Sequence, residues 1–168
     1  GKACGSMVLD IGGGTSDIAV LSLGDIVCST SLKVAGNRFT QLIIDYLRKY
    51  RKLAIGEQMA EEVKIRIGSA LPLDEPLTMK VSGLALDSGL PVTIEVNSNE
   101  VESALRSAVD EIVRAVRTVL EITPPELAAD IIQRGIVMTG GGSLLQNFDE
   151  RLRSELQIPV YIAENALH

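Results

Sequence analysis

The sequence is poor in aromatic residues, histidine and cysteine. It contains no tryptophan and only 3% aromatic residues, although 46% of its 168 residues are hydrophobic, so its core must be aliphatic. The single histidine, His168, is the last residue of the sequence, which excludes a histidine-ligated metal site and a serine–histidine pair. Cys4 and Cys28 lack metal-type spacing; two reduced thiols are favoured over a disulfide, which the count alone allows.

The sequence also lacks an excess of basic residues and long apolar runs. The formal net charge of -6 gives no basic face for neutralising phosphate backbones, so nucleic acid is not expected as a primary partner. No apolar run reaches the roughly 20 residues of a membrane span, and the first residues do not resemble a signal peptide. The length of 168 residues fits one domain, or one domain with a small insert.

The sequence does have two glycine triplets, one near each end. The first, Gly12-Gly13-Gly14-Thr15, separates two predicted strands of a hairpin. Three residues without side chains exceed what a hairpin turn needs, and they leave bare N–H groups that suit an anion. Thr15 offers a hydroxyl to the same anion, and Asp10 is placed to hold a hydrated Mg²⁺. The alternative is a plain flexible turn in which Asp10 is a turn-capping residue.

The second triplet, Gly140-Gly141-Gly142-Ser143, follows a short apolar strand over 136–139. Continuous apolarity predicts a strand buried on both faces. A helix is predicted over 144–156, and a strand, a glycine turn and a helix N-terminus together favour phosphate binding. The alternative is a glycine-rich turn with Ser143 as the helix N-cap.

The remaining periodicity predicts a meander and a series of helices. Residues 1–6 read as a lead-in, the third strand of the meander covers 25–34, and a helix begins near Arg38. The longest helix starts near Glu100 with Ser98 or Asn99 as its cap. The next helix takes Thr123 as its cap, and the last strand covers 158–162.

A change of composition between 55 and 97 indicates a small inserted subdomain. It contains a helix closed by Gly68 and two strands, over 77–82 and 91–97. Glu61 and Lys64 lie three residues apart and project from one helix face. They form either a surface ion pair, which the spacing alone favours, or a polar pair for ribose, with Glu61 accepting and Lys64 donating.

Both glycine runs resemble motifs of one superfamily, that of actin, hexokinase and the heat-shock chaperones. Leu9–Thr15 resembles its second phosphate motif, and Ile136–Ser143 resembles its adenosine motif. Ala60–Lys64 is similar to its adenosine-contacting helix. Within the superfamily the chain most resembles the bacterial actins of the MreB type, notably over Lys64–Gly68 and Thr123–Leu127.

The resemblance implies an α/β, ribonuclease-H-like (actin-like ATPase) fold with a small inserted α+β subdomain. Residues 1–54 and 98–168 would form the nucleotide-binding domain, and residues 55–97 the insert. It also implies that the chain is the second half of such a protein, because the first phosphate motif and the residue that orients the attacking water have no counterpart. No catalytic residue is therefore assigned, and the chain alone is expected to bind ATP weakly and turn it over negligibly.

The function implied is that of a filament-forming ATPase that organises cell shape and cell-wall synthesis. Its partners would be further copies of itself and cell-shape and cell-wall synthesis proteins, in the cytoplasm at the inner face of the membrane. ATP and Mg²⁺ would be its cofactors, with Asp10 holding Mg²⁺ through water. The nucleotide would contact Gly12, Gly13, Gly14, Thr15, Glu61, Lys64, Gly140, Gly141, Gly142 and Ser143.

Some features leave other functions open. Arg38 stands where relatives often carry an acidic residue, so no metal or polar role is assigned to it. A chaperone or sugar kinase of the same superfamily is one alternative, although the chain has no room for a large substrate domain. A non-enzymatic interaction module is another, although Asp10 and both glycine triplets are intact.

Overall fold

The computed structural model describes residues 4–164, which form two β-sheets and five α-helices. The strands are β1 (Gly5–Ile11), β2 (Ser16–Ser22), β3 (Asp25–Leu32), β4 (Leu53–Ala54), β5 (Thr78–Ala85), β6 (Pro91–Asn97), β7 (Ile136–Thr139) and β8 (Val160–Ile162). The helices are α1 (Gly36–Tyr50), α2 (Glu57–Ile67), α3 (Ser98–Ile122), α4 (Pro125–Arg134), the 3₁₀ helix η1 (Gly141–Leu144) and α5 (Phe148–Leu156). None of the described helices combines the length and the apolar composition that crossing a bilayer requires.

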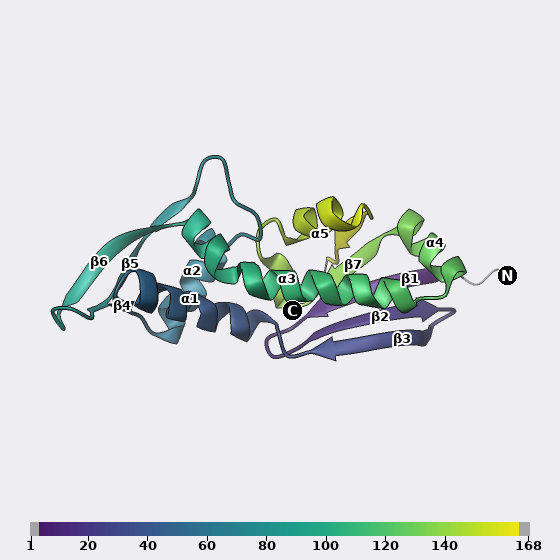
Figure 1. Ribbon diagram of the computed structural model, residues 1–168, viewed down its shortest axis with the longest axis horizontal. Coiled ribbons are helices and arrows are strands. Elements are labelled where there is room, and N and C mark those ends of the chain that lie inside the picture. The colour runs from purple at the N-terminus through teal and green to yellow at the C-terminus, as the bar shows by residue number, and fades with distance from the viewer. Residues whose placement is uncertain (1–3, 165–168) are drawn as a thin grey trace.

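The two sheets lie toward opposite ends of an elongated molecule, and the long helix α3 extends from the smaller sheet along the larger one (Figure 1). The larger sheet has the order β3-β2-β1-β7-β8, in which β1, β2 and β3 form the predicted antiparallel meander. The smaller sheet, β4-β5-β6, is antiparallel. The predicted α/β class is confirmed.

Parallel pairing of β1 with β7 determines where the two glycine triplets lie. Leu9 is the register partner of Met138, and Asp10 is the partner of Thr139. The carboxyl ends of these strands therefore lie at the same edge of the sheet, and a glycine run follows each of them directly. Residues about 130 positions apart in the sequence are neighbours for this reason.

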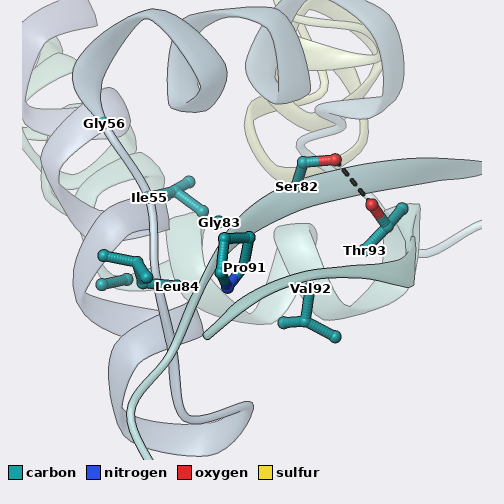
Figure 2. A pocket seen from close by; sticks show the side chains of 9 residues that line it. Ile55, Gly56, Ser82, Gly83, Leu84, Pro91, Val92 and Thr93 are labelled. Atoms are coloured by element: carbon teal, nitrogen blue, oxygen red, sulfur yellow. Dashed lines mark hydrogen bonds between the residues drawn. The ribbon is translucent and has the colours of Figure 1, made fainter. Parts of the chain in front are cut away.

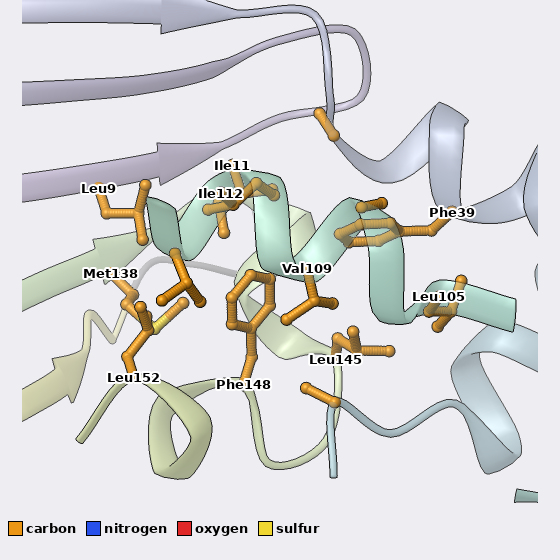
Figure 3. Close-up of a cluster of buried hydrophobic side chains, with 14 of the residues drawn as sticks. Leu9, Ile11, Phe39, Leu105, Val109, Ile112, Met138, Leu145, Phe148 and Leu152 are labelled. Carbon is orange, nitrogen blue, oxygen red and sulfur yellow. The ribbon is translucent and has the colours of Figure 1, made fainter. Parts of the chain in front are cut away.

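The hydrophobic core packs on one face of the larger sheet and continues to the smaller sheet, through Met79, Val81 and Val96. Inward-facing side chains of β1 and β7, including Leu9 and Met138, pack with residues of α3 and α5 (Figure 3), and Ile131 of α4 belongs to the same buried cluster. The aromatic rings of Phe39 and Phe148 meet with their centroids 6.3 Å apart. On the opposite face Val137 is 38% exposed. The prediction that β7 is buried on both faces is wrong, because the described helices cover only one.

Several element ends differ from the predictions. Asn97, rather than Ser98 or Asn99, caps α3: its side chain accepts from the N–H of Glu100, whose carboxylate accepts from the N–H of Asn97. Thr123 does not cap α4, because its hydroxyl donates to the carbonyl of Val119 in α3 at 2.7 Å. β1 begins within the predicted lead-in, at Gly5.

The continuous helix predicted over 144–156 is broken. The single turn η1 ends at Leu144, and α5 begins only at Phe148, after Asn147 adopts a left-handed backbone with φ 65°. Long-range bonds hold the intervening residues: Ala70 N–H donates to Gln146 at 2.8 Å, and the Asn147 amide donates to Ser69 at 3.1 Å. Tertiary contacts override the helical pattern here.

The remaining differences concern the insert and the C-terminal end. β4 was not predicted; it falls at the end of the predicted 1–54 segment, yet it pairs with β5 of the small sheet. The division into 1–54 with 98–168 and 55–97 remains a prediction. The sequence predicts no closing element over Asn165–His168 after its last strand, and these residues lie outside the described range.

Replacing Phe148 tests the contribution of the aromatic contact to the core. Phe148 is fully buried, so Phe148→Ala is expected to lower the free energy of unfolding by about 3–5 kcal/mol. Phe148→Leu conserves more volume and is expected to cost less than about 1.5 kcal/mol. Urea unfolding of both variants measures this, and equal small losses would show that Phe148 is not a central packing residue.

Candidate functional site: a pocket between two glycine turns

Residues of both glycine triplets line one pocket of about 440 Å³. Gly12 and Gly13 contribute from the β1–β2 turn, and Gly141 and Gly142 from the turn after β7. The start of α1, one face of α2 and the segment after η1 complete the walls. The other lining residues are Gly36, Asn37, Phe39, Glu61, Lys64, Ile65, Leu144 and Leu145.

The first glycine turn is held by the start of α1. The carbonyls of Gly12 and Gly13 accept from the N–H groups of Gly36 and Asn37 at 3.0 and 2.8 Å. The first N–H groups of a helix have no acceptor within the helix, and no side chain caps α1. The carbonyls of the glycine turn serve as their acceptors instead. Among the hydrogen bonds of the described residues, none uses the N–H groups of Gly13 and Gly14. They remain as donors for an anion.

The second glycine turn packs against the end of β1. Gly140 has φ 82° and ψ 159°, a conformation that is essentially restricted to glycine. A Cβ at Gly140 would overlap the carbonyl oxygen of Ile11, and one at Gly142 would overlap the Ile11 side chain. Gly141 faces open space, with nothing within 4 Å of an added Cβ.

Ser143 is fully buried and does not begin α5 as an N-cap. Its hydroxyl donates to the carbonyl of Gly140 at 2.6 Å, which closes the turn internally. The helix N-terminus expected directly after the glycines is replaced by η1. Bare backbone, rather than the dipole of a long helix, is therefore what this turn presents to the pocket.

Asp10 and Thr15 lie beside the pocket rather than in its wall. Asp10 is exposed and is the cross-strand partner of Asp17. Its carboxylate lies against the second glycine turn: Oδ1 is 2.5 Å from the position that a Cβ of Gly140 would occupy. The Thr15 hydroxyl donates to Asp17 at 3.3 Å. No group of three potential metal ligands occurs in the described part of the chain. A hydrated Mg²⁺ needs only one or two carboxylates together with phosphate oxygens, so the donors present fit that ion.

Glu61 and Lys64 form the ion pair that their spacing suggests, but they form it at the pocket. Lys64 Nζ lies 2.9 Å from Glu61 Oε1, and Thr40 donates to Glu61 Oε2 at 2.8 Å. Burial raises the pKa of Glu61, but the bonds from Lys64 and Thr40 and the charge of Lys64 outweigh it, so the pKa is below its ordinary value. The Glu61 carboxyl group is therefore ionised at neutral pH.

Thr40 is a site residue that sequence reasoning missed. It is 4% exposed and stands on α1 between the glycine turn and α2. One signal could have identified it: the helical spacing of Phe39 and Ile43 indicates a buried helix face, and Thr40 lies between them in the sequence, where a hydroxyl needs a polar partner. Arg38, the departure noted in the sequence, is exposed.

A second hollow, of about 590 Å³, lies on the small sheet around Gly83 and Pro91 (Figure 2). Its hydroxyl groups, those of Ser82 and Thr93, are hydrogen-bonded to each other at 2.8 Å. None of its lining residues is charged. The pocket between the glycine turns is smaller, yet it alone of the two combines unpaired backbone donors with charged side chains.

The sheet order and the glycine turns at one sheet edge define the actin-like α/β fold. The structure of MreB5 of Spiroplasma citri bound to ADP matches this chain with a TM-score of 0.94 and 43% sequence identity, over 98% of this chain and 50% of that chain. Residues 1–168 match the MreB/Mbl protein family. The chain belongs to that family.

Two curated relatives are similar over nearly the full chain. The cell shape-determining protein Mbl of Bacillus subtilis (strain 168) is 52% identical over 163 residues, 97% of this chain and 49% of that protein. The cell shape-determining protein MreB of Escherichia coli (strain K12) is 49% identical over 166 residues, 99% of this chain and 48% of that protein. The chain thus spans about half the length of these relatives. Family membership disfavours the chaperone and sugar-kinase alternatives.

Adjacent glycines in the second turn provide a matched test of the geometry. Gly140→Ala places a Cβ against Ile11 in a glycine-only conformation and is expected to lower the free energy of unfolding by about 1–3 kcal/mol. Gly141→Ala enters open space and is expected to change it by less than about 0.5 kcal/mol. Denaturant unfolding compares the two variants, and equal losses would contradict the close approach of this turn to β1.

Proposed function

We propose that this chain forms one wall of an ATP–Mg²⁺ site in an MreB-like, filament-forming protein. The observation that carries the proposal is the shared pocket: two glycine turns from distant parts of the sequence open onto it, beside a charged Glu61–Lys64 pair. The similarity to an MreB5 structure bound to ADP gives further support.

Each turn has its own part in binding the nucleotide. The N–H groups of Gly13 and Gly14 donate to the terminal phosphates, and the exposed Thr15, the next residue, adds its hydroxyl. Gly141 allows the adenosine end to approach the backbone closely, because nothing lies within 4 Å of the position of its missing Cβ. Gly142 packs on Ile11 and lines the same pocket. Gly140 and Ser143 act indirectly, since one packs on β1 and the other closes the turn.

Asp10 is the residue proposed to bind the magnesium ion through water. Its exposed carboxylate stands at the end of β1, beside both turns. A bound Mg²⁺ would neutralise phosphate charge that the backbone donors cannot balance alone. Asp17, the cross-strand partner, adds a second negative charge at the same sheet edge.

Hydrolysis and assembly are proposed for the protein as a whole. No catalytic residue is assigned within this chain, which spans about half the length of its relatives. Family membership supports ATP hydrolysis and self-association into filaments. Contacts with cell-shape and cell-wall synthesis proteins, in the cytoplasm at the inner face of the cell membrane, are part of the same proposal. The names of both relatives support a part in determining cell shape.

Substitution of Asp10 tests the proposed site. Asp10→Ala should leave folding intact, because the side chain is exposed, and should weaken Mg²⁺-dependent ATP binding about tenfold, or about 1.4 kcal/mol. Asp25→Ala removes an equal charge at the opposite end of β2 and β3 and should bind ATP as the unmodified chain does. Titrations with and without Mg²⁺ provide the measurement. Unchanged affinity in Asp10→Ala would remove the metal role of this residue.

A further inference from the structure

Thr40 is the centre of a closed set of polar contacts between α1 and α2. Its hydroxyl lies 2.8 Å from Glu61 Oε2, 3.0 Å from Lys64 Nζ and 3.1 Å from the carbonyl oxygen of Gly36. A hydroxyl has one proton, so only one of the two acceptors receives it. The carboxylate is the stronger acceptor, because hydrogen bonds to ionised groups are stronger than those to neutral carbonyls.

The ammonium group of Lys64 completes this arrangement. It donates to Thr40 at 3.0 Å and to the carbonyl of Gly36 at 3.2 Å, and it lies 2.9 Å from Glu61 Oε1. An ammonium has three donors, and all three have protein acceptors here. The Gly36 carbonyl is therefore satisfied by Lys64, which releases the Thr40 proton for Glu61.

This arrangement separates the functions of the two charged residues. Lys64 has no donor left for a ligand, whereas each carboxylate oxygen of Glu61 uses one acceptor position and keeps another. The Glu61 side chain is 47% exposed and lines the pocket, so these acceptor positions are open to a ligand. Two bonds, one to each oxygen, fix the rotation of the carboxylate.

We propose that Thr40 is a positioning residue that, with Lys64, fixes Glu61 as a paired acceptor for the two neighbouring hydroxyls of a nucleoside sugar. The inference rests on the proposed nucleotide-binding function and deepens it. The sugar role of Glu61 is already an expectation from the sequence; the new element is that Thr40 and Lys64 hold its carboxylate in place. Pre-setting matters because a side chain that is already ordered loses less entropy when the ligand binds.

The same contacts join the sugar end of the pocket to the phosphate end. Gly36 accepts from Lys64 through its carbonyl and donates through its N–H to the carbonyl of Gly12 at 3.0 Å. The path from Glu61 through Lys64 and Gly36 to Gly12 thus consists of direct polar contacts. A change at Thr40 acts on Glu61 without replacing any residue that lines the pocket.

The test compares ATP with 2′,3′-dideoxyATP, which lacks both sugar hydroxyls, in titrations followed by backbone amide NMR. The unmodified chain should bind ATP about tenfold more tightly than the dideoxy compound, the effect expected of hydrogen bonds to a charged acceptor. Thr40→Val, which keeps the side-chain shape but removes the hydroxyl, should lose most of this preference. Thr40→Ser, which keeps the hydroxyl, should restore it.

The outcomes separate the inference from the proposed function. Equal affinity of the unmodified chain for both nucleotides would overturn the sugar role of Glu61 even if Thr40→Val does not fold. Equal loss of both affinities in Thr40→Val would show a merely structural role and would also overturn the inference. No binding of either nucleotide by the folded, unmodified chain would instead reject the proposed function, and the sugar role with it.

Discussion

The close approach of the Gly140–Gly142 turn to the end of β1 is the constraint on which the site depends. Parallel pairing of β1 and β7 brings the two strand ends to one edge, but only residues without side chains can then share that edge. A Cβ at Gly140 or Gly142 would meet Ile11, a fully buried core residue. The glycines thus serve the fold first, and the open backbone that results is what the proposed nucleotide would contact.

The helices give the site its second wall and its charge. α1 begins on the carbonyls of Gly12 and Gly13, and α2 is tied to α1 through Thr40, Lys64 and Gly36. The insert therefore contacts the rest of the chain at the site itself. The proposed nucleotide would lie where three separate parts of the sequence meet, which is why no single motif describes the pocket.

The sequence predicts an element correctly where local residue preferences or a regular spacing of apolar residues determine it. Alternation and turn residues predicted the β1–β3 meander, and helical spacing predicted α1, α2 and α3. The prediction fails where distant contacts decide, as at Asn147, which Ser69 holds in a left-handed conformation that ends the helical pattern. β4 is too short to show a pattern, and the contacts of Thr40 depend on how α1 and α2 pack. The resemblance supplied the pairing of the glycine runs, which spacing alone does not.

The most direct measurement of the central claim is a map of backbone amide shifts in this chain as ATP and Mg²⁺ are added. If the two turns form one site, the amides of Gly13 and Gly14 and those of Gly141 and Gly142 shift together, with one common affinity. The amides of Gly56 and Gly83, which line the uncharged hollow of the small sheet, do not shift. Shifts confined to one glycine turn, or centred on the small sheet, would contradict a site shared by the two turns.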